Sequence, residues 1–232
     1  KIRFALPEKR EREKIYTHYL NEMKLSMDVS EIVDTLSKQS CGFSGADISN
    51  MCNEACILSV RNKSDIVTRD ILQAALDNIM LGPEKKTFRL SEEERKIVAY
   101  HESGHTVVAH LCDDASPPIK VSIMPRGKSA LGFSQMERKD KKLSNKKEMY
   151  DRICVLLGGR AAEELFCEEI TTGACDDLEK STELAYKYES IFGTFHFQKE
   201  KEEYSEKLRQ KMDQAVQKLI KGAYSRTKQM LR

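Results

Sequence analysis

The sequence contains no tryptophan, and aromatic residues make up only 7% of its 232 residues. No apolar run approaches the roughly 20 residues of a membrane-spanning helix, and no signal peptide opens the chain. Lys and Arg number 39 against 37 Asp and Glu, so no excess charge favours nucleic acid or an anionic membrane surface. The chain is expected to be soluble as it stands, although it begins in mid-pattern and looks like part of a longer protein.

The seven cysteines are scattered, odd in number and never spaced as C-x-x-C. They predict neither a disulfide framework nor a cysteine zinc site, and they favour a reducing compartment. The pattern G-x-x-x-x-G-K-[ST] is also absent, so this chain alone is not expected to hold nucleotide phosphates in a P-loop. We also find no internal repeat.

Residues 1 to 81 have the pattern of four short amphipathic helices joined by short loops. Pro7, Asp28, Ser44 and Thr68 are the expected starting residues, and each is followed by apolar residues at helical spacing. Such a segment predicts a small four-helix bundle. Gly82 and Pro83 then interrupt the pattern, so a domain boundary is expected at residues 81–86.

The most informative stretch is His101-Glu102-Ser103-Gly104-His105, an H-E-x-x-H pattern. Residues four apart lie on one face of a helix, so the two imidazoles can share one metal ion. Glu102 points to the adjacent side, where it can act on a water without ligating the metal. A lone histidine on an apolar face is usually a core histidine, but a pair at this spacing with Glu between favours a metalloprotease site.

This interpretation requires a helix, and the flanking sequence predicts one. Ser91 and Glu94 form a capping-box pattern, with further acids in the first turn where the helix dipole favours them. Apolar residues and both histidines then recur with helical spacing as far as Cys112.

The rest of the second half mixes short strands with helices. Residues 119–123 alternate as a half-buried strand, and residues 131–135 are a candidate partner after the turn at residues 125–127. Helices are expected from about Ser144 to the pair Gly158-Gly159, from Asp176 or Asp177, and from about Lys201 to the end.

Catalytic zinc usually takes three protein ligands, so a third is needed. His18, His110 and His196 are poorly placed, which favours a carboxylate. Asp176 and Asp177 lie in the first turn of a predicted helix, where the dipole keeps a carboxylate ionised. Both could equally be ordinary helix-start acids, and Asp113 and Asp114 are weaker rivals.

Several separate motifs, in the same order along the chain, resemble the C-terminal half of FtsH-family proteins, the membrane-anchored AAA+ zinc metalloproteases. The likeness covers about residues 1 to 193, and the closing helix is similar in character. The motifs are Arg3-Phe4 with Leu6-Pro7, Gly42 to Ile48, Asn53-Glu54-Ala55, Ala99 to His105, Pro125-Arg126-Gly127, Leu131-Gly132, Gly158 to Glu164, and Thr172-Gly173-Ala174 with Asp176-Asp177-Leu178. One departure is a short, charged segment at residues 194–204, where the family has a longer apolar stretch.

The resemblance implies a mainly α fold with two domains. Residues 1–81 would be the helical lid of an AAA+ ATPase module whose nucleotide-binding core lies upstream, and residues 88–232 a mostly helical zinc peptidase domain with a short β element. Gly45 and Ala46 would then lie near adenine, with ATP and Mg²⁺ bound only together with that upstream core.

The resemblance also implies the site and the partners. His101, His105 and Asp177 would hold Zn²⁺, with Asp176 as the runner-up, and Glu102 would be the general base. The substrates would be unfolded polypeptides or membrane proteins, degraded with ATP by a homo- or hetero-hexamer, with no nucleic acid involved. The full-length protein would be anchored in a bacterial inner membrane or an organelle membrane of the mitochondrial or plastid type through N-terminal segments.

Two other functions remain open at this point. One is a proteolytically inactive assembly or chaperone module of such a complex. The other is a stand-alone metalloprotease unrelated to ATPases, which would leave the helical first half unexplained.

Overall fold

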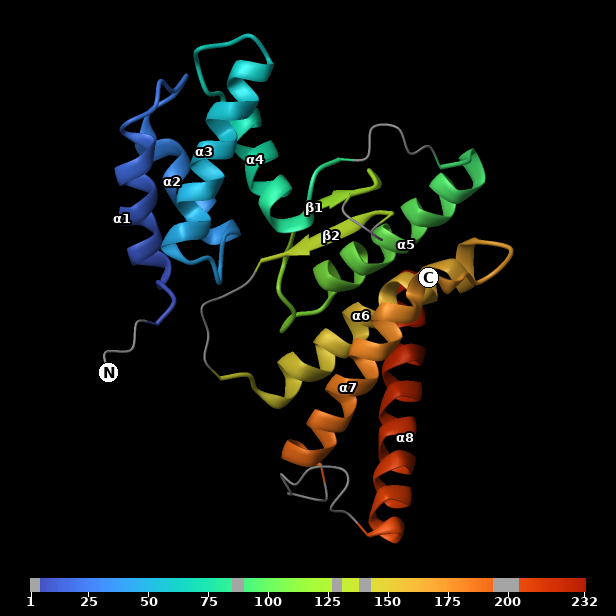
Figure 1. The fold of residues 1–232 in the computed structure, drawn as a ribbon. Helices are drawn as coiled ribbons and strands as arrows, with labels where there is room; N and C mark the ends of the chain where they lie inside the picture. The colour runs from blue at the N-terminus through green and yellow to red at the C-terminus, as the bar shows by residue number, and fades with distance from the viewer. Residues whose placement is uncertain (1–4, 85–89, 127–130, 138–142, 194–204) are drawn as a thin grey trace. The chain divides into compact units, whose positions relative to one another are not determined.

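The computed structural model describes residues 5–84, 90–126, 131–137, 143–193 and 205–232. These residues form eight α-helices, one short 3-10 helix and one two-stranded sheet, which confirms the predicted mainly α fold with a short β element. They divide into two compact units (Figure 1), and each is described by itself. Arg3-Phe4, Gly127 and the charged segment 194–204, all singled out above, lie outside the described residues.

The first unit holds the four helices predicted from the sequence. Ser44 and Thr68 cap their helices through side-chain oxygens, and Asp28 precedes the second helix. The first helix begins after Glu8 rather than at Pro7, because Glu8 and Glu11 form the capping box. The helices are α1 (Lys9–Leu20), α2 (Val29–Gln39), α3 (Gly45–Arg61) and α4 (Arg69–Leu81).

The core of the first unit combines apolar side chains with one buried cation. Tyr16, Leu36, Met51 and Leu72 are among its fully buried residues. Arg12 is also buried, and its guanidinium donates two hydrogen bonds to the carbonyl of Ser37, at 3.0 and 2.9 Å. These bonds join α1 to the end of α2 and give two of the buried guanidinium N–H donors an acceptor.

The second unit is built on the helix that carries the two histidines. Its elements are α5 (Glu92–Leu111), β1 (Pro118–Ser122), β2 (Phe133–Met136), α6 (Lys146–Phe166), the 3-10 helix η1 (Thr172–Ala174), α7 (Cys175–Phe192) and α8 (Glu206–Leu231). Its core lies among α5, α6, α7 and α8, around residues such as Val108, Ile153, Leu157, Ala185 and Val216. Among the described residues, no helix is both long enough and apolar enough to cross a membrane.

The two strands form an antiparallel pair beside α5 (Figure 1). Ser122 is paired with Phe133, and Val121 with Ser134. Both strands contact α5, so this small sheet covers one side of the histidine helix. The predicted strand positions are therefore correct to within one or two residues.

α6 does not end at the glycine pair that the sequence suggested as its limit. It continues through Gly158 and Gly159 as far as Phe166. Both glycines face α5, where an added Cβ would meet the backbone of Gly104 or the ring of His101. A Cβ atom added at Gly104 would lie 2.4 Å from the carbonyl oxygen of Gly158 and 2.6 Å from the Cβ of Ala162. The two helix backbones touch here with no room for a methyl group.

Replacing glycine by alanine should have opposite effects on stability at Gly104, which lies in this contact, and at Gly222, which lies outside it. Gly104→Ala should lower the free energy of unfolding by about 2 kcal/mol, because backbone atoms of α6 must move to admit the methyl group. Gly222→Ala, at an exposed position of α8, meets only the Tyr150 hydroxyl at 3.8 Å and should raise the free energy of unfolding by about 1 kcal/mol through helix propensity. Urea unfolding of the metal-free variants measures both, and equal effects would contradict the packing described.

Candidate metal centre

His101 and His105 extend from one face of α5, one helical turn apart. The helix begins where predicted, with Ser91 and Glu94 forming a reciprocal capping box. Both rings are largely buried, and their Nε2 atoms lie 3.1 Å apart. The predicted i, i+4 geometry is therefore present.

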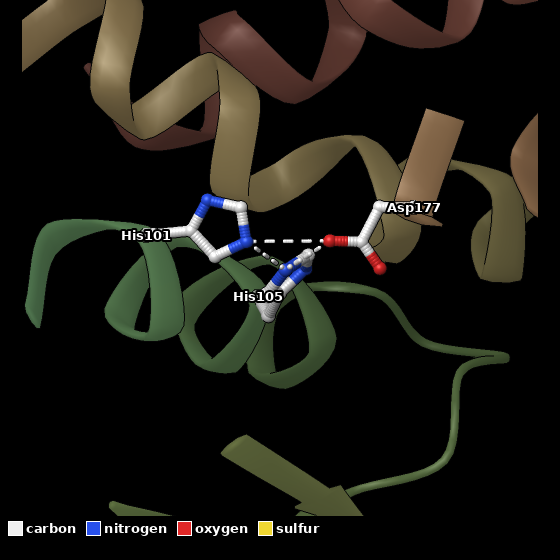
Figure 2. A group of neighbouring side chains, drawn as sticks. All are labelled: His101, His105 and Asp177. Carbon is white, nitrogen blue, oxygen red and sulfur yellow. Dashed lines mark hydrogen bonds and ion pairs between the residues drawn. The ribbon is translucent and has the colours of Figure 1, made fainter. Parts of the chain in front are cut away.

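Asp177 joins the two imidazoles from the first turn of α7, which directly follows η1. Its Oδ2 atom lies 3.2 Å from Nε2 of His101 and 3.1 Å from Nε2 of His105 (Figure 2). Burial would raise the pKa of the Asp177 carboxyl, but its interactions with the two adjacent imidazoles outweigh burial and hold the pKa well below its usual value. The carboxylate is therefore ionised at neutral pH.

The far nitrogen of each ring is held by a hydrogen-bond acceptor on α6. Nδ1 of His101 lies 2.6 Å from a carboxylate oxygen of Glu163, and Nδ1 of His105 lies 2.7 Å from the carbonyl oxygen of Val155. A carbonyl oxygen and an ionised carboxylate can only accept, so each Nδ1 carries the proton. In a neutral ring, Nε2 then carries a lone pair, which is directed at the space between the two rings and Oδ2 of Asp177.

Glu163 is a residue of the site that the sequence interpretation missed. It is almost completely buried, and its second carboxylate oxygen accepts a hydrogen bond of 2.7 Å from the backbone N–H of Thr171. Burial raises the pKa of Glu163, while the bonds from His101 and Thr171 lower it by more, so it stays ionised. The usable signal was its position one turn after Gly159, on the face of α6 that approaches α5.

Glu102 lies beside the histidines and outside the group of three. It is 8% exposed, and its carboxylate accepts a hydrogen bond from the hydroxyl of Ser134. The sequence predicted this placement for Glu102 but gave no indication of Ser134.

The rival candidates for the third ligand lie elsewhere. Asp176 is exposed and forms an ion pair with Lys180 on its own helix. Asp113 and Asp114 are exposed and follow the end of α5. The backbone N–H of Asp114 donates a hydrogen bond to the carboxylate of Asp151.

The other histidines are not in the described group either. His18 belongs to α1 of the first unit, His110 is exposed near the end of α5, and His196 lies outside the described residues. Gly45 and Ala46 form the first turn of α3, and their contact with adenine stays a prediction.

The donor set fits a cation. Within the described residues, His101, His105 and Asp177 are the group whose ligand atoms come close enough to hold a metal ion. Two lone pairs and a carboxylate oxygen lie 3.1–3.2 Å from one another, an arrangement that repels unless a positive charge sits among them. Tetrahedral ligands about 2.0–2.1 Å from one zinc ion would be separated by about 3.3 Å, close to the distances seen.

The fold and the site together define a class of protein. A helix bearing H-E-x-x-H, completed by an aspartate from a second helix, is a zinc metallopeptidase type of centre. Residues 88–232 match the family model of Peptidase family M41, and residues 28–74 match the AAA+ lid domain. The chain therefore belongs to peptidase family M41, the FtsH-type zinc metalloproteases.

Its relatives agree with this assignment. The ATP-dependent zinc metalloprotease FtsH of Pseudothermotoga lettingae is 36% identical over 250 residues, which cover 100% of this chain and 40% of that protein. The mitochondrial inner membrane m-AAA protease component AFG3L1 of Mus musculus is 40% identical, over 97% of this chain and 30% of that protein. The mitochondrial ATP-dependent zinc metalloprotease FTSH 3 of rice (Oryza sativa subsp. japonica) is 41% identical, over 81% of this chain and 23% of that protein. The chain thus spans less than half the length of these relatives.

The site also predicts how zinc binding depends on pH. Burial lowers the pKa of His101, but hydrogen bonds to Asp177 and Glu163 outweigh it and raise the pKa to about 9 in the metal-free protein. A proton then occupies the place of the cation below pH 9, and zinc must displace it. Zinc affinity should therefore rise with pH up to about 9, with proton release at pH 7.

Titration calorimetry at pH 7 in two buffers of different ionisation enthalpy measures that release. The same pair of titrations above pH 9 is the control and should show less proton release. A zinc affinity that is flat between pH 6 and pH 9 would contradict the prediction.

Proposed function

We propose that this chain is the peptidase part of an ATP-dependent FtsH-type protease and that it hydrolyses peptide bonds in unfolded polypeptides. The observation that carries the proposal is the convergence of His101, His105 and Asp177 on one point (Figure 2), with Glu102 on the same helix as the two histidines. The family match and the relatives named as zinc metalloproteases support it.

In this proposal His101, His105 and Asp177 hold zinc, and Glu102 moves the proton. Bound zinc would supply Lewis acidity, making water more acidic and a carbonyl carbon more electrophilic. Glu102 takes a proton from the attacking water and passes it to the departing amine, so its carboxylate is regenerated in each cycle. Glu163 and the Val155 carbonyl keep the two imidazoles in the tautomer that leaves Nε2 available.

The two-stranded sheet offers a way to hold an extended substrate. Within the described residues β1 and β2 form an antiparallel pair beside α5, and we expect one of these strands to pair with an extended peptide through its backbone. Backbone pairing reads few side chains, which suits a protease that accepts unfolded chains of many sequences.

The longer-range partners follow from the family and are part of the proposal. Residues 1–81 would be the lid of an AAA+ module, with Gly45 and Ala46 near the adenine of ATP bound with Mg²⁺, and residues 88–232 the peptidase domain. The AAA+ lid and M41 matches fall within these two ranges. The working protein would be a homo- or hetero-hexamer anchored in a membrane.

An inactive assembly module is the alternative. The complete H-E-x-x-H motif and the converged aspartate argue against it, since an inactive module has no need of them. A purified native protein that binds no zinc would favour this alternative.

The roles assigned to the acids predict separable effects. Glu102→Gln should retain one zinc per chain while peptide hydrolysis falls by about 10²- to 10⁴-fold, because only the proton carrier is lost. Asp177→Ala should lose both the metal and hydrolysis. Metal analysis together with cleavage of a short quenched fluorescent peptide measures the two properties.

Asp176→Ala is the matched control, since it removes the neighbouring acid from the same helical turn. It should leave zinc content and hydrolysis unchanged. Zinc loss in Asp176→Ala but not in Asp177→Ala would overturn the assignment of the ligands.

A further inference from the structure

The Glu102 carboxylate, carried by α5, accepts a hydrogen bond from a residue of β2. The Ser134 hydroxyl lies 2.6 Å from Oε2 of Glu102 and 3.0 Å from the carbonyl oxygen of the same residue. Glu102 is ionised when it acts as a base, so the shorter contact is a charge-assisted hydrogen bond with Ser134 as donor. Because β2 pairs with β1 against α5, the hydroxyl is held in place by the sheet.

A second observation places the residue just before β2 against the same side chain. A Cβ atom at Gly132 would lie 2.9 Å from Cγ of Glu102 and 2.8 Å from Cγ1 of Val98. The chain at Gly132 is thus packed directly against the Cγ methylene group of Glu102. Packing at Gly132 limits where the side chain can go, and the hydroxyl of Ser134 selects how the carboxylate is turned.

The Ser134 hydroxyl is not needed as a donor to the backbone carbonyl of Glu102. The Glu102 carbonyl also accepts a hydrogen bond of 2.9 Å from the Thr106 hydroxyl on α5. Thr106 therefore bonds to the backbone oxygen, whereas Ser134 reaches the carboxylate as well. This difference provides a matched pair of hydroxyls for a test.

We infer that Ser134 is a positioning residue for the general base, a role that rests on the proposed function. Its hydroxyl donates to Oε2 and holds the carboxylate in one orientation, which leaves Oε1 to take the proton from water. Ser134 touches neither substrate nor metal in this role. It acts only through Glu102.

The test compares Ser134→Ala, Ser134→Thr and Thr106→Val in the zinc-loaded protein, with a short quenched fluorescent peptide as substrate. Ser134→Ala should lower kcat by roughly tenfold or more with KM unchanged, because the loss falls on the proton-transfer step. Ser134→Thr keeps a hydroxyl on a strand that tolerates β-branching and should restore most of kcat. Thr106→Val should retain native kcat.

Two measurements that do not depend on turnover accompany the kinetics. Zinc stoichiometry and the visible absorption of the cobalt-substituted protein should be the same in all three variants and the native chain, since no ligand has changed. A Ser134→Ala variant that loses metal or alters the cobalt spectrum shows a role in holding the fold, which overturns the inference.

The other outcomes are equally decisive. A kcat within twofold of native in Ser134→Ala overturns the positioning role and leaves the proposed function intact. No rescue by Ser134→Thr, or an equal loss in Thr106→Val, also overturns it. A native protein that binds zinc but cleaves no peptide overturns the proposed function and the inference together.

Discussion

Two hydrogen bonds on the far side of the imidazole rings decide what this centre can bind. Glu163 and the carbonyl of Val155 accept from Nδ1 of His101 and His105, so each proton is kept away from the common point. The Nε2 atoms of both histidines and Oδ2 of Asp177 are then three electron-rich atoms that lie 3.1–3.2 Å from one another. Such an arrangement is stable only around a positive charge, which is a proton in the metal-free protein and zinc in the proposed working state.

The packing of α5 on α6 makes those bonds possible. Gly104 and Gly158 bring the two backbones together, and a Cβ at Gly159 would lie 2.4 Å from Cε1 of His101. Only with the helices this close can Glu163 and Val155 reach the rings. The glycines, which would normally weaken a helix, are therefore the structural condition for the metal centre.

The parts of the site predicted from the sequence depend on local rules. The cap at Ser91 and the shared face of His101 and His105 follow from spacing along one helix, so they could be derived without the fold. The mainly helical class and the approximate strand positions were predictable for the same reason. They need only hydrophobic periodicity and turn residues.

The remaining features depend on tertiary packing. Adjacent residues on a helix point in directions about 100° apart, so the choice between Asp176 and Asp177 is set by how α7 packs in the second unit. Sequence spacing alone left that choice open, and the family resemblance pointed to Asp177. Glu163 and Ser134 were missed because they reach the site across the α5–α6 contact and from β2. The continuation of α6 through Gly158 was also missed, since a glycine pair normally weakens a helix.

X-ray absorption at the zinc edge of the zinc-loaded protein tests the central claim most directly. We expect only nitrogen and oxygen ligands at about 2.0–2.1 Å, with the scattering pattern of two imidazoles. Asp177→Ala should abolish this signal. A sulfur ligand at about 2.3 Å, as Cys175 near the start of α7 would supply, or an unchanged spectrum in Asp177→Ala, would contradict the account.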